Sequence, residues 1–342
     1  MKRIIYVFCT LFLWNCRESF QQNNLQNDIS TSQTGKKIIG DDEKNKNLTP
    51  LDTSLYNQII LDLVHHKPDQ KWPVKTPYPL PGALLPFHRI VAYYGNLYTS
   101  DMGILGQKPA DAMLKKLMEE VDYWQKADSL TSVLPALHYL AVTAQHSPGK
   151  GKMYRLRMPD QQIDEVLDLA GKVKAITILD IQVGHSTLKK EIPELEKYLM
   201  MDSVHLGIDP EWSMKTGHVP GKKTGTMDAE DINYAIDYLS DLVKKHQLPP
   251  KLLIIHRFTK GMITNYKKIK TCPEVQIVIN MDGFGFAAKK ISTYRSFVAA
   301  QPVQFTGFKL FYKNDAKNPP HKLMSADEIL DLFPKPIYIQ YQ

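Results

Sequence analysis

Eight short runs of β-favouring residues recur from Arg89 onward, most of them separated by amphipathic stretches, and this repetition limits the fold more than any other feature. Some runs, such as residues 176–179 and 252–255, are almost continuously apolar, which is typical of parallel strands buried on both faces. Eight repeats without a break in composition predict a single-domain α/β fold, the (β/α)8 barrel. An open doubly wound sheet is the alternative, but no glycine-rich phosphate turn follows the first run. Strands are expected at residues 90–94, 134–142, 175–181, 204–208, 252–256, 275–281, 305–312 and 337–341.

Helix-period patterns fill most of the intervals between these runs. The stretches are residues 111–127, 161–169, 188–199 and 229–246, with a shorter one at 325–332. The chain ends at the eighth strand, so we expect the amphipathic segment 51–66 to fill the place of an eighth helix, between the last strand and the first. The proline-rich stretch 68–86 should then cross one end of the barrel without regular structure.

The first residues are typical of an export signal. A basic start is followed by the apolar run 4–14, which is too short to span a membrane as a helix and suits a signal peptide at residues 1–15. Residues 13–16 resemble the lipobox of bacterial lipoproteins, and this resemblance implies an acylated Cys16. A plain signal peptide with a chance cysteine is the alternative. The polar segment that follows suits a flexible tether, so we expect a lipidated tether at 16–50 and the barrel at 51–342.

Cysteine count and charge narrow the class of protein further. Cleavage before Cys16 would remove Cys9 and leave Cys272 as the only thiol of the barrel, so no structural disulfide is expected there. Lys and Arg number 43 against 36 Asp and Glu, a formal charge of +7, but they are spread along the chain. We therefore expect no nucleic-acid partner.

The expected protein is a monomeric lipoprotein of the cell envelope, periplasmic or on the outer surface, held by its lipid anchor and without a cofactor.

Polar side chains crowd the ends of the predicted strands, which is where (β/α)8 enzymes carry their active sites. Alternation along a strand places Asp180 with Gln182 on one face and Asp209 with Glu211 on another. Charged groups in apolar strands cost free energy unless they are paired or face water. The residues that we expect to converge at the barrel mouth are Tyr94, Asp180, Gln182, Asp209, Glu211, Trp212, His256, Arg257, Asp282, Lys309, Tyr312 and Gln340.

Paired carboxylates next to aromatic rings favour a glycoside hydrolase. Such enzymes use one carboxyl group as proton donor and a second as nucleophile or base. We assign the donor role to Glu211 and the ionised role to Asp282 or Asp209, because Lys309 would stabilise a neighbouring carboxylate. Carboxylates on the fourth and sixth strands resemble the arrangement in melibiase-type α-galactosidases, although none of their local sequence is present. The remaining polar and aromatic residues of the set are expected to bind the carbohydrate.

The same residues allow other interpretations. The charged groups could simply pair inside the barrel, or five of them, Asp180, Asp209, Glu211, His256 and Asp282, could hold a divalent metal for hydrolysis. No H-x-H or H-E-x-x-H spacing occurs among them, so no metal ligand is assigned. A buried Lys309 could form a Schiff base, as in aldolase-like lyases. A non-catalytic glycan-binding or scaffold lipoprotein is the remaining alternative.

Two basic loops are expected next to this mouth. Residues 145–157 follow the second strand and residues 217–225 follow the fourth. The second loop contains G-K-K-T-G but lacks the phosphate-loop spacing, so we interpret it as a cover over the rim. The positive charge of both loops makes an anionic glycan a candidate substrate.

Five segments carry a resemblance to known sequences, and it extends from about Val91 to the C-terminus. The segments are residues 179–182, 207–212, 255–258, 280–285 and 306–312, together with the ending 338–342. Over them the chain resembles a group of uncharacterised bacterial exported proteins and lipoproteins. The resemblance implies export and a glycosidase-like barrel, and it transfers no functional residue.

Overall fold

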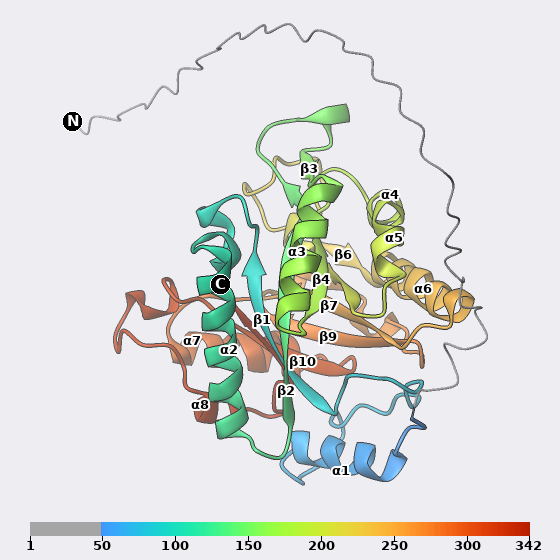
Figure 1. Ribbon diagram of the computed structural model, residues 1–342, viewed down its shortest axis with the longest axis vertical. Coiled ribbons are helices and arrows are strands. Elements are labelled where there is room, and N and C mark those ends of the chain that lie inside the picture. Colours follow the sequence, from blue (N-terminus) through green and yellow to red (C-terminus); the bar gives the residue numbers. More distant parts are fainter. Residues whose placement is uncertain (1–48) are drawn as a thin grey trace, which may run out of the picture. The chain divides into compact units, whose positions relative to one another are not determined.

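Eight parallel strands close into a ring in the computed structural model, which describes residues 49–342 (Figure 1). The order around the ring is β1-β11-β10-β9-β7-β5-β4-β2, and β2 returns to β1. All eight predicted strands are present and the barrel prediction is confirmed. The strands are β1 (His88–Gly95), β2 (Ser132–Ala144), β4 (Ile176–Ile181), β5 (Val204–Ile208), β7 (Lys251–Arg257), β9 (Val275–Met281), β10 (Phe305–Leu310) and β11 (Tyr338–Tyr341).

The first strand closes the ring by pairing on both of its edges. Ile90 lies opposite Tyr338 of β11 and opposite Leu134 of β2, and both pairings are parallel. Because side chains alternate along each strand, this register sends residues of one parity inward on every strand. A small apolar cluster that includes Ile90 and Ile254 fills the lower interior, while a larger cluster lies between the strands and the surrounding helices.

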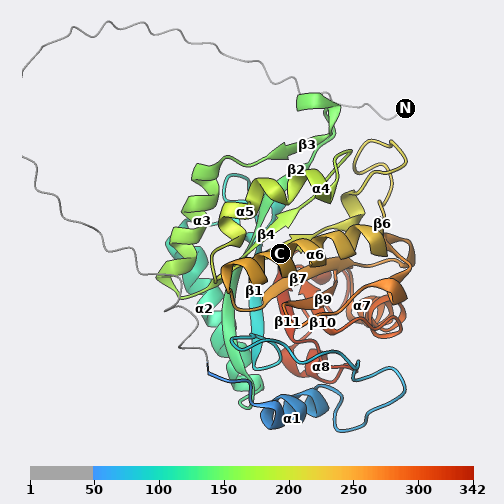
Figure 2. The ribbon, with the colours of Figure 1, turned by 90° about the vertical axis from the view of Figure 1, so that its right-hand side faces the viewer.

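Helices cover the outside of the ring (Figures 1 and 2). The predicted helix at 229–246 is confirmed as α6, which opens with a capping box between Asp228 and Asp231. The predicted helix 188–199 is instead divided at Pro193, which cannot donate a backbone hydrogen bond. The helices of the outer layer are α2 (Ala110–Ala127), α3 (Asp160–Lys172), α4 (Leu188–Glu191), α5 (Glu196–Leu199), α6 (Ala229–His246), α7 (Ala287–Thr293), which continues as a π-helical turn (Tyr294–Ala299), and α8 (Ala326–Leu330).

The N-terminal helix does not occupy the place that we predicted for it. Helix α1 (Thr53–Leu63) lies at the end of the barrel where the strands begin, as Figures 1 and 2 show. Its Leu63 joins the interior cluster with Leu85, and the Lys335 backbone donates to the Leu63 carbonyl. Helix α2 reaches the seam between β11 and β1 instead, since the Trp124 indole donates to the Tyr341 hydroxyl at 2.9 Å, and α8 packs beside α2.

The proline-rich segment crosses the bottom of the barrel without regular secondary structure, as predicted. Leu85 is fully buried there, at 0% exposure. The buried Gln276 amide of β9 accepts from the backbones of Leu84 and Leu85 and donates to the Leu85 carbonyl. Burial of an irregular segment requires such partners for its backbone groups. Leu85 therefore serves as a plug for the lower end of the ring.

Three short strands lie outside the ring of eight. Strand β3 (Arg155–Arg157) pairs antiparallel with the end of β2, while β6 (Met227–Asp228) and β8 (Ile263–Thr264) form a separate parallel pair. The pairing of β3 carries the loop after β2 beyond the C-terminal end of the barrel (Figure 2). These strands were too short to be predicted from alternation.

The export predictions concern residues beyond this description. The predicted signal peptide, Cys16 and the tether as far as residue 48 lie outside the described residues. Within residues 49–342, no helix combines the length and apolar character that crossing a membrane requires. Cys272 is a free thiol.

Truncation of the plug should destabilise the barrel. We expect Leu85→Ala to lower the free energy of unfolding by about 2–5 kcal/mol, because a fully buried leucine is replaced by a cavity. The matched control is Leu130→Ala, since Leu130 is 88% exposed and should change stability by less than about 0.5 kcal/mol. Urea unfolding of both variants is the measurement. Equal losses of unfolding free energy in the two variants would contradict the role of Leu85 as a plug.

Candidate active site

A cavity of about 620 Å³ opens at the C-terminal end of the strands. Carboxylates from the ends of β5 and β9, a lysine from β10 and an aromatic residue from β1 line it. These side chains face the interior because every second side chain of a barrel strand points inward. Seven predicted site residues line it together: Tyr94, Gln182, Asp209, Glu211, Trp212, Asp282 and Lys309. These seven residues, which were expected to converge at the barrel mouth, therefore lie around one cavity.

Asp282 lies between a lysine and a histidine. Its Oδ1 is 3.0 Å from Lys309 Nζ, and its Oδ2 is 2.8 Å from His256 Nδ1. Lys309 Nζ also lies 3.8 Å from the ring centroid of Tyr94, a favourable cation–π distance. Burial alone would raise the pKa of Asp282, but Lys309 and His256 lower it to about 2. Asp282 is therefore ionised at neutral pH.

Glu211 has the opposite environment in the same cavity. It follows β5 on a single 3-10 turn (Pro210–Trp212), and it has no salt-bridge partner among the described residues. Burial and the negative charge of Asp282 raise the pKa of Glu211 to about 7. Carboxyl groups whose environments separate their pKa values in this way are suited to different roles in acid–base chemistry.

Asp209 fixes the turn that carries Glu211. Its Oδ1 accepts from the Glu211 backbone N–H at 3.0 Å and caps the 3-10 turn. Burial and the neighbouring carboxylates raise the pKa of Asp209 well above its usual value, although His256 opposes the shift. This backbone contact gives Asp209 a clear positioning role for Glu211.

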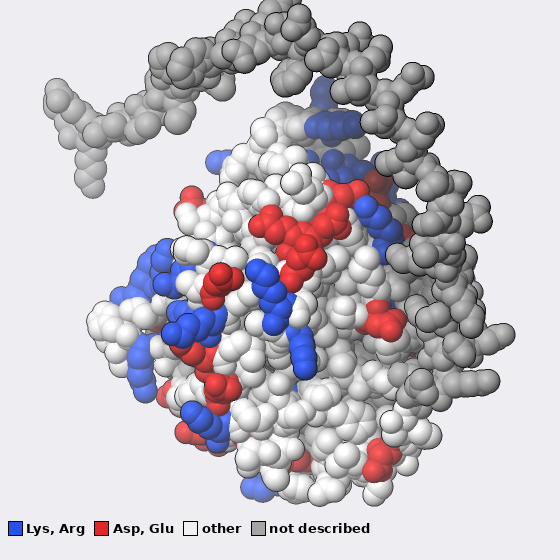
Figure 3. Space-filling view, viewed as in Figure 1, with Lys and Arg blue, Asp and Glu red and all other residues white. Residues whose placement is uncertain are grey.

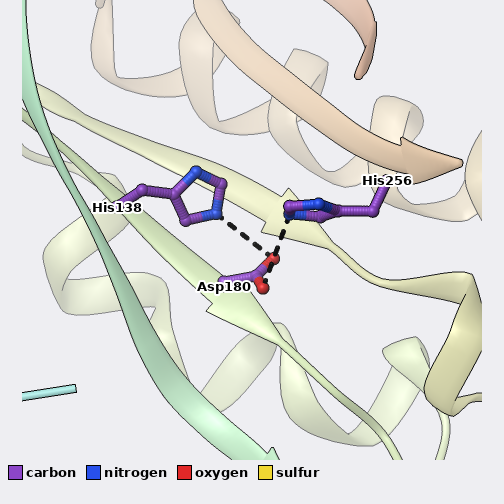
Figure 4. Close-up of side chains that lie close together, drawn as sticks. All are labelled: His138, Asp180 and His256. Carbon is purple, nitrogen blue, oxygen red and sulfur yellow. Dashed lines mark ion pairs between the residues drawn. The ribbon is translucent and has the colours of Figure 1, made fainter. Parts of the chain in front are cut away.

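Three buried side chains converge under the floor of the cavity (Figure 4). Asp180 of β4 lies between His138 of β2 and His256 of β7, and all three are 0% exposed. Asp180 Oδ1 is 3.4 Å from His138 Nε2, and Oδ2 is 3.7 Å from His256 Nε2. The Tyr94 hydroxyl lies 3.4 Å from Asp180 Oδ2, so the tyrosine separates this cluster from the cavity.

The far side of His138 is held by a second group of buried polar side chains. Its Nδ1 is 2.6 Å from the Tyr338 hydroxyl and 2.9 Å from the Gln340 amide nitrogen. Gln340 in turn accepts from Asn280 at 3.1 Å. Gln340 therefore supports the cluster from below and does not line the cavity, and Asp180 and His256 likewise lie beneath the floor.

Two predicted substrate-binding residues lie on the outside of the ring. Arg257 directly follows the inward-facing His256, so its side chain points outward, where it donates to Gln301 at 2.6 Å. The Tyr312 hydroxyl lies 3.0 Å from the hydroxyl of Tyr93 in β1 and 2.6 Å from the carboxylate of Glu120 in α2. Neither residue lines the cavity, so their predicted place at the mouth is corrected.

The sequence analysis did not single out His138 or Tyr338. A signal for His138 was present, since it is the one charged or imidazole side chain in the predicted strand 134–142. Its position opposite Tyr94 in the β1–β2 register required the structure. Tyr338 was quoted only as part of the C-terminal segment, because a tyrosine in an apolar strand is usual in a core.

The cluster has a donor set that could hold a metal ion. His138, Asp180 and His256 each offer one ligand atom, and these atoms lie within 4.8 Å of one another. The glutamate and aspartates of the cavity do not join them in such a group within residues 49–342. Two imidazole nitrogens and a carboxylate oxygen are typical ligands of zinc-like ions.

The two basic loops meet beside Glu211, near the cavity. The two loops are close at Gly221, where an added Cβ would lie 3.2 Å from His146 Nε2 of the first loop. His185, which follows β4, contacts the His218 carbonyl of the second loop at 2.8 Å. The second loop is joined to the turn through the Gly225 N–H, which donates to the Glu211 carbonyl. On the face in Figure 3, Lys and Arg are interspersed with Asp and Glu, so this face carries charges of both signs.

Comparison with known proteins finds similarity only at the level of structure. No known protein family and no curated protein matches this sequence. A ruminal GH26 endo-β-1,4-mannanase shares 12% identity over 79% of this chain and 64% of its own, with a TM-score of 0.38. GH26C from Muricauda sp. MAR_2010_75 shares 8% identity over 84% and 82%, with a TM-score of 0.32. The chain thus spans less than two thirds of the mannanase, and similarity this low assigns no reaction.

A side chain at Gly207 should disrupt the cluster. An added Cβ would overlap Asp180 Oδ1 and lie 2.6 Å from His138 Nε2, so we expect Gly207→Ala to lower the free energy of unfolding by about 1–3 kcal/mol. The control is Gly171→Ala in α3, because no atom lies within 4 Å of a Cβ added there. Removal of this helical glycine should raise the free energy of unfolding by about 0.5–1 kcal/mol. Chemical denaturation measures the free energy of unfolding of both variants. An unchanged value for Gly207→Ala would contradict the close packing of Asp180 and His138 against Gly207.

Proposed function

We propose that this protein is a glycoside hydrolase that acts through Glu211 and Asp282. The observation that supports the proposal is the pair of carboxyl groups in one 620 Å³ cavity with opposite environments. Glu211 is kept protonated near neutral pH by burial and by Asp282, while the ion pair with Lys309 at 3.0 Å keeps Asp282 charged. Hydrolysis of a glycosidic bond needs such an acid and such a base or nucleophile.

In the proposed reaction, Glu211 donates its proton to the leaving glycosidic oxygen. As the bond to that oxygen breaks, Asp282 either attacks the anomeric carbon or takes a proton from a water molecule that attacks it. In the first case a glycosyl ester of Asp282 forms, and a water molecule that gives its proton to Glu211 then hydrolyses this ester. Carboxyl groups separated by about 5–5.5 Å give retention of configuration, and those separated by about 6.5–9.5 Å give inversion. Asp209 holds the Glu211 backbone through the 3.0 Å hydrogen bond and so sets the direction of the donor.

The lining of the cavity supports a carbohydrate as substrate. Trp212, Phe284 and Phe311 present apolar rings, which suit the apolar faces of sugar rings. Gln182, Asn314 and other polar groups of the wall can exchange hydrogen bonds with hydroxyls. The two basic loops beside Glu211 are consistent with an anionic glycan.

Schiff-base chemistry at Lys309 is less well supported. The ammonium group is paired with Asp282 at 3.0 Å and lies 3.8 Å from the Tyr94 ring centroid. Both contacts stabilise the charged amine, whereas attack on a carbonyl requires the neutral form. We therefore assign Lys309 the role of stabilising the ionised Asp282 carboxylate, and no role in a lyase reaction.

The proposed location of the enzyme follows from its first residues. Export through the signal at 1–15 and acylation of Cys16 would tether the barrel to a membrane of the cell envelope. Such a tether would place the cavity in contact with extracytoplasmic polysaccharide.

Neutralisation of the two carboxylates should abolish hydrolysis. We expect Glu211→Gln to lower kcat about 10²–10⁴-fold, the usual contribution of a general acid, and Asp282→Asn to lower it at least as much. A reducing-end assay on a glycan library is the measurement, with thermal unfolding to verify folding. Glu119→Gln, an exposed carboxylate on α2, is the control. Full activity of both variants would refute the mechanism, and glycan binding without reducing ends from the wild type would favour the non-catalytic alternative.

The activity should depend on the protonation of Glu211. Because the pKa of Glu211 is raised to about 7 and the protonated form is the donor, activity should be retained below that pH. Above it, kcat/KM should fall about tenfold for each pH unit. A pH–rate profile tests this, and the alkaline limb should disappear in Glu211→Gln. A wild-type rate that stays constant from pH about 6 to 9 would contradict the assignment.

A further inference from the structure

We propose that His138, Asp180 and His256 bind one divalent metal ion of the zinc class beneath the floor of the cavity. The site is distinct from the carboxyl pair, and the proposal does not depend on hydrolysis of a glycan. The three side chains come from β2, β4 and β7, which a single closed ring brings together. Figure 4 shows both imidazole rings directed at the Asp180 carboxylate.

The first observation is a set of buried ligand atoms without hydrogen-bond partners. His138 Nε2, Asp180 Oδ1 and His256 Nε2 are inaccessible to solvent, and none makes a hydrogen bond. Unsatisfied polar atoms in a dry interior are costly and uncommon. These three lie within 4.8 Å of one another, with nitrogen–oxygen separations of 3.4 and 3.7 Å. Ligands about 2.0–2.2 Å from a shared zinc ion are separated by similar distances.

The second observation is the outer support of both histidines. His256 Nδ1 lies 2.8 Å from Asp282 Oδ2, which leaves Nε2 free to face the cluster. His138 Nδ1 lies 2.6 Å from the Tyr338 hydroxyl and 2.9 Å from the Gln340 amide nitrogen, and these contacts fix the orientation of the ring with Nε2 facing the cluster. Metal-binding histidines usually have such a partner on the second nitrogen, because it sets the ring orientation and the tautomer.

The third observation is the absence of a side chain on the neighbouring strand. Gly207 of β5 lies opposite Asp180, and a Cβ there would overlap Asp180 Oδ1 and approach His138 Nε2 to 2.6 Å. Only glycine leaves the Asp180 carboxylate and the His138 ring in their places. The barrel interior at this level is therefore shaped around the cluster.

Charge balance also favours a cation. Among the described residues, Asp180 forms ion pairs with the two histidines alone, because Lys309 pairs with Asp282 at 3.0 Å and the nearby Lys290 pairs with Asp315 at 2.8 Å. Buried carboxylates without counter-charges are strongly unfavourable. A divalent ion bound to Asp180 would compensate most of this negative charge.

The donor set also identifies the class of metal. Imidazole with carboxylate suits Zn²⁺, Co²⁺ or Ni²⁺, whereas Mg²⁺ and Ca²⁺ prefer oxygen ligands throughout. The ligands do not line the cavity, and Tyr94 lies between them and the open space. We therefore infer a structural ion that supports Asp282 through His256.

Metal content of the purified protein tests the site. After incubation with zinc and desalting, the wild type should retain about one zinc ion per chain by elemental analysis, and zinc should raise its unfolding temperature. His138→Gln and Asp180→Asn should each reduce zinc retention at least tenfold. The matched control is His205→Gln, because His205 is an equally buried barrel histidine, 2% exposed, outside the cluster.

Two further measurements keep the test decisive. Glu211→Gln should retain zinc fully, which separates this proposal from the hydrolase mechanism. If the cluster variants fail to fold, Co²⁺ added to the wild type should give the visible absorption of a protein-bound cobalt ion, and zinc should remove it. A wild type that retains no zinc and gives no cobalt spectrum would overturn the proposal, as would equal zinc retention by His138→Gln and His205→Gln.

Discussion

Hydrogen bonding between β1 and β11 closes the sheet into a ring, and the arrangement of the site depends on this closure. It brings Tyr338 opposite Ile90 and Gln340 opposite Ala92, so strands from the two ends of the domain share one interior. Alternation then decides which side chains face inward. His138, Asp180 and His256 come from three strands and meet only because the ring is closed. An open sheet with the same strands would separate them.

Depth in the ring gives the inward-facing side chains different environments. Apolar residues and Leu85 fill the bottom, the histidine–aspartate cluster lies above them, and the carboxyl pair borders the open cavity. Lys309 contacts Asp282 and not Glu211, so two carboxyl groups of one cavity have opposite preferences for the proton. Lys309 and His256 beside Asp282, together with the burial of Glu211, thus account for the division of roles that the proposed chemistry requires.

The strands and the mouth of the barrel were predictable because both follow from local patterns. Apolar runs identified all eight strands, and the strand ends identified Glu211 and Asp282. Helix α1 was misplaced because amphipathicity shows that a face is buried but not which surface buries it. Arg257 was predicted at the mouth because it lies at the end of a strand. Alternation after the inward-facing His256 points its side chain outward instead. His138 was missed because its partners are distant in sequence and meet it only through the register.

The proposed chemistry requires a carboxyl group that remains protonated near neutral pH beside one that does not. Carbon-13 NMR of carboxyl-labelled protein measures this directly, without knowledge of the substrate. The account predicts a glutamate carboxyl signal that titrates near the Glu211 pKa of about 7 and is missing from the spectrum of Glu211→Gln. It would be contradicted if every glutamate signal titrated at its ordinary value, close to about pH 4.3.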